Sequence, residues 1–287
     1  MAQSVATQSQ PRQVLLVECP DRRGLVHDIT GVLLRHQCNV TSNHEFVDAE
    51  AGRFFMRTEF TGEVNATSVV GETEKLLPEG GSARLAKAGK RRVVLLASKE
   101  HHCLADLLVR NAFNELNAEI AAVISNHDTL RPLVEKFGLP FHHLSHEGLS
   151  REEHEAAVTN LLDALQPEWL VLAKYMRVLG TKFVARYAQR MVNIHHSFLP
   201  AFVGAKPYQQ AFQRGVKVIG ATAHFVTEQL DEGPIILQQV IPVDHTHSAA
   251  DMAQAARDVE QIVLSRALKL VFEDRVFLSG NRTIIFD

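Results

Sequence analysis

An uninterrupted apolar run about a third of the way along the chain constrains the fold more than any other feature. Residues 92–98 contain the apolar residues VVLLA in succession. The run is too short for a typical helix and offers apolar side chains to both faces of a strand, which is typical of a parallel sheet covered on both sides. Further apolar runs and helical patterns alternate with it, at residues 104–116, 119–125, 150–165, 169–173, 218–226 and 235–243. This alternation predicts βαβ units and a mostly parallel, Rossmann-like sheet in an α/β domain.

Two helix starts carry a capping signal. Ser150 is followed three positions later by Glu153, and Ser248 stands in the same relation to Asp251. A serine at the N-cap accepts from the backbone N–H three residues on, and the acidic side chain there returns a bond to the serine. We therefore expect one helix to begin after Ser150 and a final helix to begin after Ser248.

The N-terminal part of the chain has a different pattern. Strand candidates and helical patterns follow one another in the order βαββαβ, at residues 14–17, 25–34, 38–47, 54–60, 67–77 and 83–85. This is the ferredoxin-like, split βαβ arrangement. The small, basic stretch 86–90 is typical of a linker. The predicted domains are therefore residues 12–86 and residues 91–287.

The turn between the first strand and the first helix contains Asp21, Gly24 and Leu25. With this placement, residues 12–86 resemble the ACT family of amino-acid-sensing regulatory domains. The resemblance implies an effector, methionine or glycine, whose carboxylate is received by helix N–H groups at the turn. It also implies a homo-oligomer, and we expect a tetramer. A plain ferredoxin-like oligomerisation module is the alternative.

Composition argues against several classes of partner. The 30 Lys+Arg against 33 Asp+Glu leave a net charge of -3, which disfavours a nucleic-acid binder with a broad cationic surface. The first thirteen residues lack a secretory apolar core and are expected to form a frayed tail, and no run reaches the roughly 18 apolar residues of a membrane span. Three cysteines without a C-x-x-C pair favour a reducing compartment. We expect a soluble, cytoplasmic protein.

A carboxamide and an imidazole stand two positions apart at the end of a short extended segment. Asn193 and His195 follow residues 191–192, and side chains at i and i+2 of a strand point to the same side. Ligands of open α/β sheets bind at the carboxyl edge of the strands. Asp231, in a turn with Gly233 after another strand, would complete a trio there.

These three side chains suit the removal of a formyl group from nitrogen. The asparagine supplies an N–H donor, and the histidine supplies a donor or a proton. An aspartate beside the histidine favours the charged imidazole and orients or helps to deprotonate a water. The chemistry requires no nucleophilic serine or cysteine.

Residues 172–239 resemble the catalytic domain of the tetrahydrofolate-dependent formyltransferases. The family motif of Asn-x-His, a Ser-Leu-Leu-Pro-like segment and a later aspartate is matched by Asn193, His195 and Asp231, with Phe198 in place of a leucine. The resemblance extends over most of residues 91–280 and implies that two further segments bind the folate. These substrate-binding residues are Met176, Arg177, Val178, Leu179, Thr227, Glu228, Gln229 and Leu230.

Departures from the formyltransferase pattern concern the acceptor. The ribonucleotide formyltransferases carry a glycine-rich, phosphate-binding loop after the first strand, whereas residues 98–103 here read SKEHHC. His196 stands where proline is common, and Lys206 stands where those enzymes place a histidine. His196 is either a structural partner of the site or a surface side chain. His101 and His102 are expected to narrow the acceptor site.

An ACT-like domain joined to this catalytic domain is similar, over the whole chain, to the formyltetrahydrofolate deformylase family. The resemblance implies that water replaces the amine, so that 10-formyltetrahydrofolate is hydrolysed to formate and tetrahydrofolate in one-carbon metabolism and purine supply. It implies no cofactor beyond the folate substrate. Two alternatives stay open: formyl transfer to an acceptor without a phosphate, and a non-catalytic binding protein that responds to an amino acid or a folate.

Histidine clusters raise the question of a metal ion. His142, His143 and His146 lie together, and His245 and His247 form an H-x-H pair. Neither cluster has an accompanying cysteine or the carboxylate frame that zinc sites use. We therefore predict no metal site.

Overall fold

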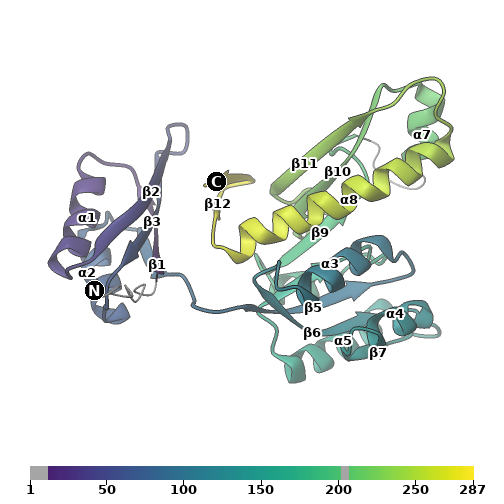
Figure 1. Cartoon of the computed structure of the whole chain (residues 1–287), viewed down its shortest axis with the longest axis horizontal. Coiled ribbons are helices and arrows are strands. Elements are labelled where there is room, and N and C mark those ends of the chain that lie inside the picture. The colour runs from purple at the N-terminus through teal and green to yellow at the C-terminus, as the bar shows by residue number, and fades with distance from the viewer. Residues whose placement is uncertain (1–11, 202–206) are drawn as a thin grey trace, which may run out of the picture. The chain divides into compact units, whose positions relative to one another are not determined.

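The computed structural model describes residues 12–201 and 207–287 and divides the chain into two compact units (Figure 1). One unit extends to Ala88 and includes Phe286–Asp287, and the other runs from Gly89 to Ile285. The boundary falls within the expected linker, while the last two residues group with the first unit. Lys206 and the first eleven residues of the expected tail lie outside the described residues.

The first unit has the βαββαβ order. Its elements are β1 (Arg12–Pro20), α1 (Leu25–Arg35), β2 (Asn39–Asp48), β3 (Arg53–Thr61), α2 (Ala66–Leu76) and β4 (Ser82–Leu85). The strands form an antiparallel sheet in the order β2-β3-β1-β4. Helix α1 buries Leu25, Ile29 and Leu33, at the spacing that puts side chains on one helical face. The tail prediction is wrong at its end, because Arg12 and Gln13 pair with β3 and belong to the sheet.

The second unit alternates strands and helices before it ends in a long helix and a hairpin. Its elements are β5 (Arg91–Ala97), α3 (His102–Ala112), β6 (Ala118–Ser125), the short helix η1 (Asp128–Leu130), α4 (Arg131–Glu135), β7 (Phe141–His143), α5 (Arg151–Leu165), β8 (Trp169–Leu172), α6 (Thr181–Arg186), β9 (Met191–His195), α7 (Pro207–Arg214), β10 (Val218–Phe225), β11 (Ile235–Pro242), α8 (Ala249–Phe272), β12 (Val276–Ser279) and β13 (Arg282–Ile285). None of the helices in the described ranges is long and apolar enough to cross a membrane.

The main sheet of this unit has the strand order β11-β10-β9-β8-β5-β6-β7. Strands β7, β6, β5, β8 and β9 are parallel, and β10 and β11 add an antiparallel edge. The expected α/β fold with a mostly parallel sheet is confirmed. Since β9 is the last parallel strand, its carboxyl end lies beside the antiparallel strand that returns from the opposite direction.

The apolar run that predicted a doubly covered strand lies at the centre of this sheet as β5. Val93 and Leu95 belong to the core under α3 and α8, whereas Val94 and Leu96 belong to the core under α5 and α6. Helices therefore cover both faces (Figure 1). With both faces closed, the strand ends are left as the places where polar side chains meet a ligand.

Both predicted capping boxes are present, at Ser150 before α5 and at Ser248 before α8. The short elements were not predicted from the sequence: β7, α4, α6, α7 and the β12–β13 hairpin. Each is too short to show an apolar period of its own. Helix α3 begins at His102 and not at Leu104, so the histidine of the loop joins the first helical turn.

Gly233 closes the base of the β10–β11 connection, which carries Asp231. The N–H of Phe225 donates to the carbonyl of Pro234 at 2.9 Å, which brings the two ends of the connection together. A Cβ at position 233 would lie 1.8 Å from the carbonyl oxygen of Phe225. The close approach of two backbone segments therefore requires glycine here.

We predict that Gly233→Ala lowers the free energy of unfolding by about 1–3 kcal/mol, the usual cost of overpacking, because the opposing atom belongs to the backbone. Urea unfolding followed by circular dichroism measures this. The control is Gly71→Ala in α2, where an added Cβ meets nothing within 4 Å and alanine is the better helix former. Equal stability of Gly233→Ala and wild type would contradict the prediction.

Candidate active site

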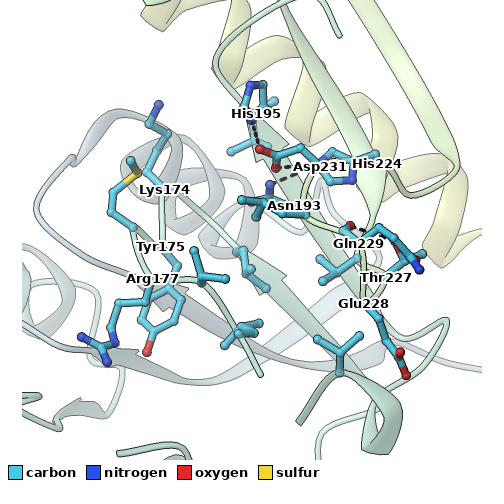
Figure 2. A pocket seen from close by; sticks show the side chains of 18 of the residues that line it. Lys174, Tyr175, Arg177, Asn193, His195, His224, Thr227, Glu228, Gln229 and Asp231 are labelled. Atoms are coloured by element: carbon cyan, nitrogen blue, oxygen red, sulfur yellow. Dashed lines mark hydrogen bonds and ion pairs between the residues drawn. The ribbon is translucent and has the colours of Figure 1, made fainter. Parts of the chain in front are cut away.

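A pocket at the carboxyl end of β8 and β9 contains every residue predicted to be catalytic or substrate-binding. Its lining residues are Leu172, Lys174, Tyr175, Met176, Arg177, Val178, Leu179, Val184, Asn193, Ile194, His195, His196, His224, Val226, Thr227, Glu228, Gln229, Leu230 and Asp231. Figure 2 shows Asn193, His195 and Asp231 converging on one side of this pocket. Residues remote in sequence thus share one cavity, as the trio hypothesis requires.

His195 and Asp231 form the central contact of the pocket. His195 ends β9, and its Nδ1 lies 3.2 Å from Oδ2 of Asp231 in the β10–β11 connection. The other ring nitrogen, Nε2, is buried and has no hydrogen-bond partner among residues 12–201 and 207–287. Since buried polar atoms are nearly always paired, an unpaired nitrogen in a pocket points to a ligand atom that completes it.

His224 holds the third member of the trio. The antiparallel register places His224 opposite Asn193, and Asn193 Nδ2 lies 3.1 Å from His224 Nε2. His224 Nδ1 lies 2.9 Å from the carbonyl oxygen of Phe225. Because a carbonyl oxygen can only accept a hydrogen bond, Nδ1 carries the ring proton and is the donor. His224 Nε2 is then an acceptor for one Asn193 N–H. The described residues leave the second N–H of Asn193 available to a ligand.

The environment sets the charge of these groups. Burial raises the pKa of Asp231, but the hydrogen bond and the charge of His195 outweigh burial and lower it below its ordinary value. Burial lowers the pKa of His224, and its bond to the Phe225 carbonyl offsets this only in part. At neutral pH the pocket therefore contains an ionised Asp231 next to His195 and a neutral His224.

His196 is a structural neighbour of the trio. Its ring lies 4.9 Å from that of His195 and 6.2 Å from that of Tyr208, centroid to centroid. Burial, followed by the positive charges of Lys174 and His195, lowers the pKa of His196 to about 4. The residue is thus neutral at pH 7, and it packs beside His195 as an uncharged ring.

The segment 176–179 is anchored by a serine that the sequence analysis treated only as part of the altered loop. The backbone N–H of Met176 donates to Ser98 Oγ at 3.0 Å, and Ser98 Oγ donates to Asn126 Oδ1 at 2.7 Å. Met176 and Val178 are exposed at 62% and 48%. Fixed backbone with exposed apolar side chains suits contact with a flat, aromatic ligand.

The opposite wall comes from residues 227–230. Thr227 Oγ1 donates to the carbonyl of Gln229 at 3.1 Å, which stabilises the turn, and Leu230 is 58% exposed. Asp231 follows with φ +58°, in the left-handed region that aspartate tolerates better than most residues. This conformation turns its carboxylate back toward His195.

Sequence reasoning missed His224, Lys174 and Ser98. His224 was visible only as part of a strand, because its role depends on the β9–β10 register, which residue spacing does not reveal. Ser98 directly follows β5 and Lys174 lies two residues after the end of β8, and that position was the available signal. Neither His101, which is exposed, nor His102, which is buried, is among the described residues that line the pocket. Lys206 falls outside the described part of the chain.

The predicted regulatory residues lie in the first unit. Gly24 caps α1 with φ +88°, a conformation that favours glycine. Asp21 is exposed, whereas the Leu25 side chain is 2% exposed and packs in the core. Leu25 therefore offers a ligand its backbone N–H and not its side chain.

Ligand atoms suited to a metal ion gather at one place in the described residues, and this place differs from the clusters considered from sequence. His102, Cys103 and Glu260 offer three atoms within 4.8 Å of one another. The ammonium of Lys174 lies 3.0 Å from Glu260 Oε2, so a cation already neutralises this carboxylate. The group has the character of an ion-pair network.

Comparison with known proteins identifies two families in this chain. Residues 91–268 match the formyl transferase family and residues 13–78 match the ACT domain family. Formyltetrahydrofolate deformylase of Escherichia coli O6:H1 is 57% identical over 277 residues, which cover 96% of this chain and 99% of that protein.

Solved structures give the same result. The crystal structure of a formyltetrahydrofolate deformylase from Pseudomonas syringae is 42% identical, with a TM-score of 0.93 over 98% of this chain and 96% of that one. The formyltetrahydrofolate deformylase of Burkholderia mallei is 41% identical, with a TM-score of 0.90 over 96% of this chain and 99% of that one.

The lowered pKa of His196 predicts a pH-dependent stability. A histidine whose folded pKa lies below its unfolded value stabilises the fold fully above about pH 6.5 and loses that contribution as the pH falls toward 4. Between pH 7 and pH 5 we expect His196 to account for a loss of about 1–2 kcal/mol of unfolding free energy.

Urea unfolding of wild type and His196→Asn at both pH values isolates this contribution, since the other titrating groups are common to the two proteins. We expect a smaller loss in His196→Asn. Equal losses in the two proteins would show that His196 titrates alike in the folded and unfolded states.

Proposed function

Since the chain belongs to the formyltetrahydrofolate deformylase family, we propose that it hydrolyses 10-formyltetrahydrofolate to formate and tetrahydrofolate around Asn193, His195 and Asp231. The observation that supports this assignment most directly is the buried Nε2 of His195, which no described residue pairs in the pocket. A formyl oxygen at hydrogen-bond distance would complete it. The chain thus acts in one-carbon metabolism.

The formyl oxygen is held by two donors that the protein fixes in advance. His195 Nε2 is one, since Nδ1 is engaged by Asp231 at 3.2 Å. The second N–H of Asn193 is the other, since His224 takes the first. Donors already oriented toward the developing oxyanion stabilise the tetrahedral intermediate without a cost of reorganisation at the moment of reaction.

Water is the nucleophile in this proposal. Its oxygen adds to the formyl carbon, and the carbon–oxygen double bond becomes the oxyanion. The added water is far more acidic than free water, so the ionised Asp231 accepts its proton despite the lowered pKa of the carboxylate. The carbon–N10 bond then breaks, and the His195–Asp231 pair returns the proton to N10. The formyl group leaves as formic acid, which releases its remaining proton to solvent and becomes formate. Tetrahydrofolate leaves as well, and the protein is unchanged.

The folate ring lies, in this proposal, between the two predicted binding segments. The backbone of residues 176–179 faces its polar edge, with Met176 and Val178 as exposed apolar contacts. Residues 227–230 close the other side. Arg177 is a substrate contact in this arrangement, at the end of the pocket away from His195 in Figure 2. No cofactor beyond the folate enters the mechanism.

The first unit is proposed to regulate the second. Its ACT match supports the binding of an amino-acid effector, with methionine and glycine as the candidates, at the turn formed by Asp21, Gly24 and the backbone of Leu25. Gly24 leaves the N-terminus of α1 open to a carboxylate.

We also propose a homo-oligomer, a tetramer, with control of purine supply as its role in the cytoplasm. The edge strand β2 supports association, since Phe46 and Val47 are exposed on it at 44% and 42%. The three free cysteines, Cys19, Cys38 and Cys103, are compatible with a reducing compartment.

We predict that His195→Ala and Asp231→Asn each reduce formate release from 10-formyltetrahydrofolate by about 10²–10⁴-fold, the usual value of a positioned acid or base. The measurement is formate production by purified protein with no amine present. His245→Ala, at an exposed histidine outside the pocket, is the matched control and should keep wild-type turnover. Wild-type rates in either pocket variant would remove that residue from the mechanism.

We predict that glycine or methionine changes the rate or the KM of wild type, with alanine as the control amino acid, and that Asp21→Asn weakens the response. The turn offers N–H groups to the effector carboxylate, and Asp21 lies beside its amino group in this proposal. Steady-state kinetics at increasing effector concentration measure both effects. If neither amino acid changes either constant, only the oligomerisation role remains for the first unit.

A further inference from the structure

A buried carboxylate behind the pocket gathers three donors from three separate elements. Glu260 of α8 is 1% exposed. It accepts from His102 Nε2 at 2.7 Å, from the hydroxyl of Tyr208 at 2.8 Å and from the ammonium of Lys174 at 3.0 Å. Burial raises the pKa of Glu260, but the bond from His102 and the charge of Lys174 reverse this and lower it to about 2. The carboxylate is therefore ionised and fully engaged.

Lys174 is held in a conformation that lysine rarely adopts. It follows β8 with φ +63°, in the left-handed region where a residue with a Cβ is strained. Its side chain is only 8% exposed although it lines the pocket. A glycine would adopt this backbone conformation without strain. The chain therefore carries a long side chain at a position where the backbone favours glycine. The ion pair with Glu260 fixes where that side chain goes.

This side chain lies at the catalytic end of the pocket. His196 adjoins His195, and the charges that act on His196 include those of Lys174, His195, Glu260 and Asp231. In Figure 2 Lys174 lies across the pocket from Asn193 and Asp231, while Arg177 and Glu228 lie toward the other end. The folate segments and Lys174 therefore border different parts of the same cavity.

We propose that Lys174, anchored by Glu260, is a specificity-determining residue that fills the space in which an amine acceptor would approach the formyl carbon and leaves room for water alone. This inference rests on the proposed hydrolase function and specifies its acceptor. The amine reaction differs from hydrolysis only in the group that adds: the amine nitrogen bonds to the formyl carbon, the carbon–N10 bond breaks, and the amine proton passes to N10. The trio serves either acceptor, so the occupied space selects between them.

The test replaces Lys174 in the full-length protein, so that the space its side chain fills becomes available to an amine. Lys174→Gly removes the side chain and suits the left-handed backbone, whereas Lys174→Met keeps the length of the side chain without the charge. Each protein receives 10-formyltetrahydrofolate with increasing concentrations of glycinamide, a small primary amine. Formate and formylglycinamide are measured together, so the ratio of the two products reports the acceptor and is independent of the amount of active protein.

We expect formate as the only product of wild type and Lys174→Met. Lys174→Gly should divert at least a tenth of the formyl groups to glycinamide. Lys174→Asn, a short residue that also tolerates the left-handed region, repeats the measurement should the glycine variant fail to fold. Gln166→Gly, at another left-handed position (φ +50°) on the exposed C-terminus of α5, controls for backbone flexibility and should behave as wild type.

The proposal would be overturned if Lys174→Gly and Lys174→Asn, where they fold, gave formate as their only product. Formylglycinamide from Lys174→Met in the same proportion as from Lys174→Gly would also overturn it, because the charge and not the occupied space would then decide the acceptor. Failure of the proposed function is distinguishable from both results, since wild type would then release no formate even without amine.

Discussion

The contact between His195 and the Asp231 carboxylate is the interaction on which the proposed chemistry depends. It leaves Nε2 of His195 buried and, within the described part of the chain, unpaired, and it keeps Asp231 ionised in a half-buried place. The contact exists because two backbone constraints meet: His195 ends the last parallel strand, and Asp231 takes a left-handed conformation in a connection closed at Gly233. A shift of register by one residue would turn the imidazole away from the carboxylate.

The architecture of the sheet explains why the site lies where it does. Helices on both faces of β5 leave the carboxyl ends of the strands as the open edge, and the antiparallel β10 brings His224 against Asn193. His224 therefore acts through Asn193: its tautomer is fixed by the Phe225 carbonyl, and this orients the carboxamide. The buried Lys174–Glu260 pair closes the other side of the same edge. In the proposed mechanism, one edge thus combines an oxyanion site, a proton carrier and a barrier.

The fold was largely predictable because its signals are local. The apolar run of β5, the capping boxes at Ser150 and Ser248 and the βαββαβ order are each visible within a few residues, and each is present in the structure. Short elements such as β7 and α6 were missed because they span too few residues to show a hydrophobic periodicity. The spacing of Asn193 and His195 at a strand end pointed to the trio, and the family resemblance gave it a specific chemistry. The two proposed folate segments came from the resemblance alone.

The sequence by itself determined two domain types, a parallel sheet covered on both faces and the residue types of a formyl-handling site. Only the tertiary structure decided that His224 fixes Asn193, that Ser98 anchors Met176 and that Lys174 reaches Glu260. The physical reason is that hydrophobic period and helix caps act between near neighbours, whereas these contacts join residues from separate strands and helices. Their existence depends on strand register and packing, which no short stretch of sequence encodes.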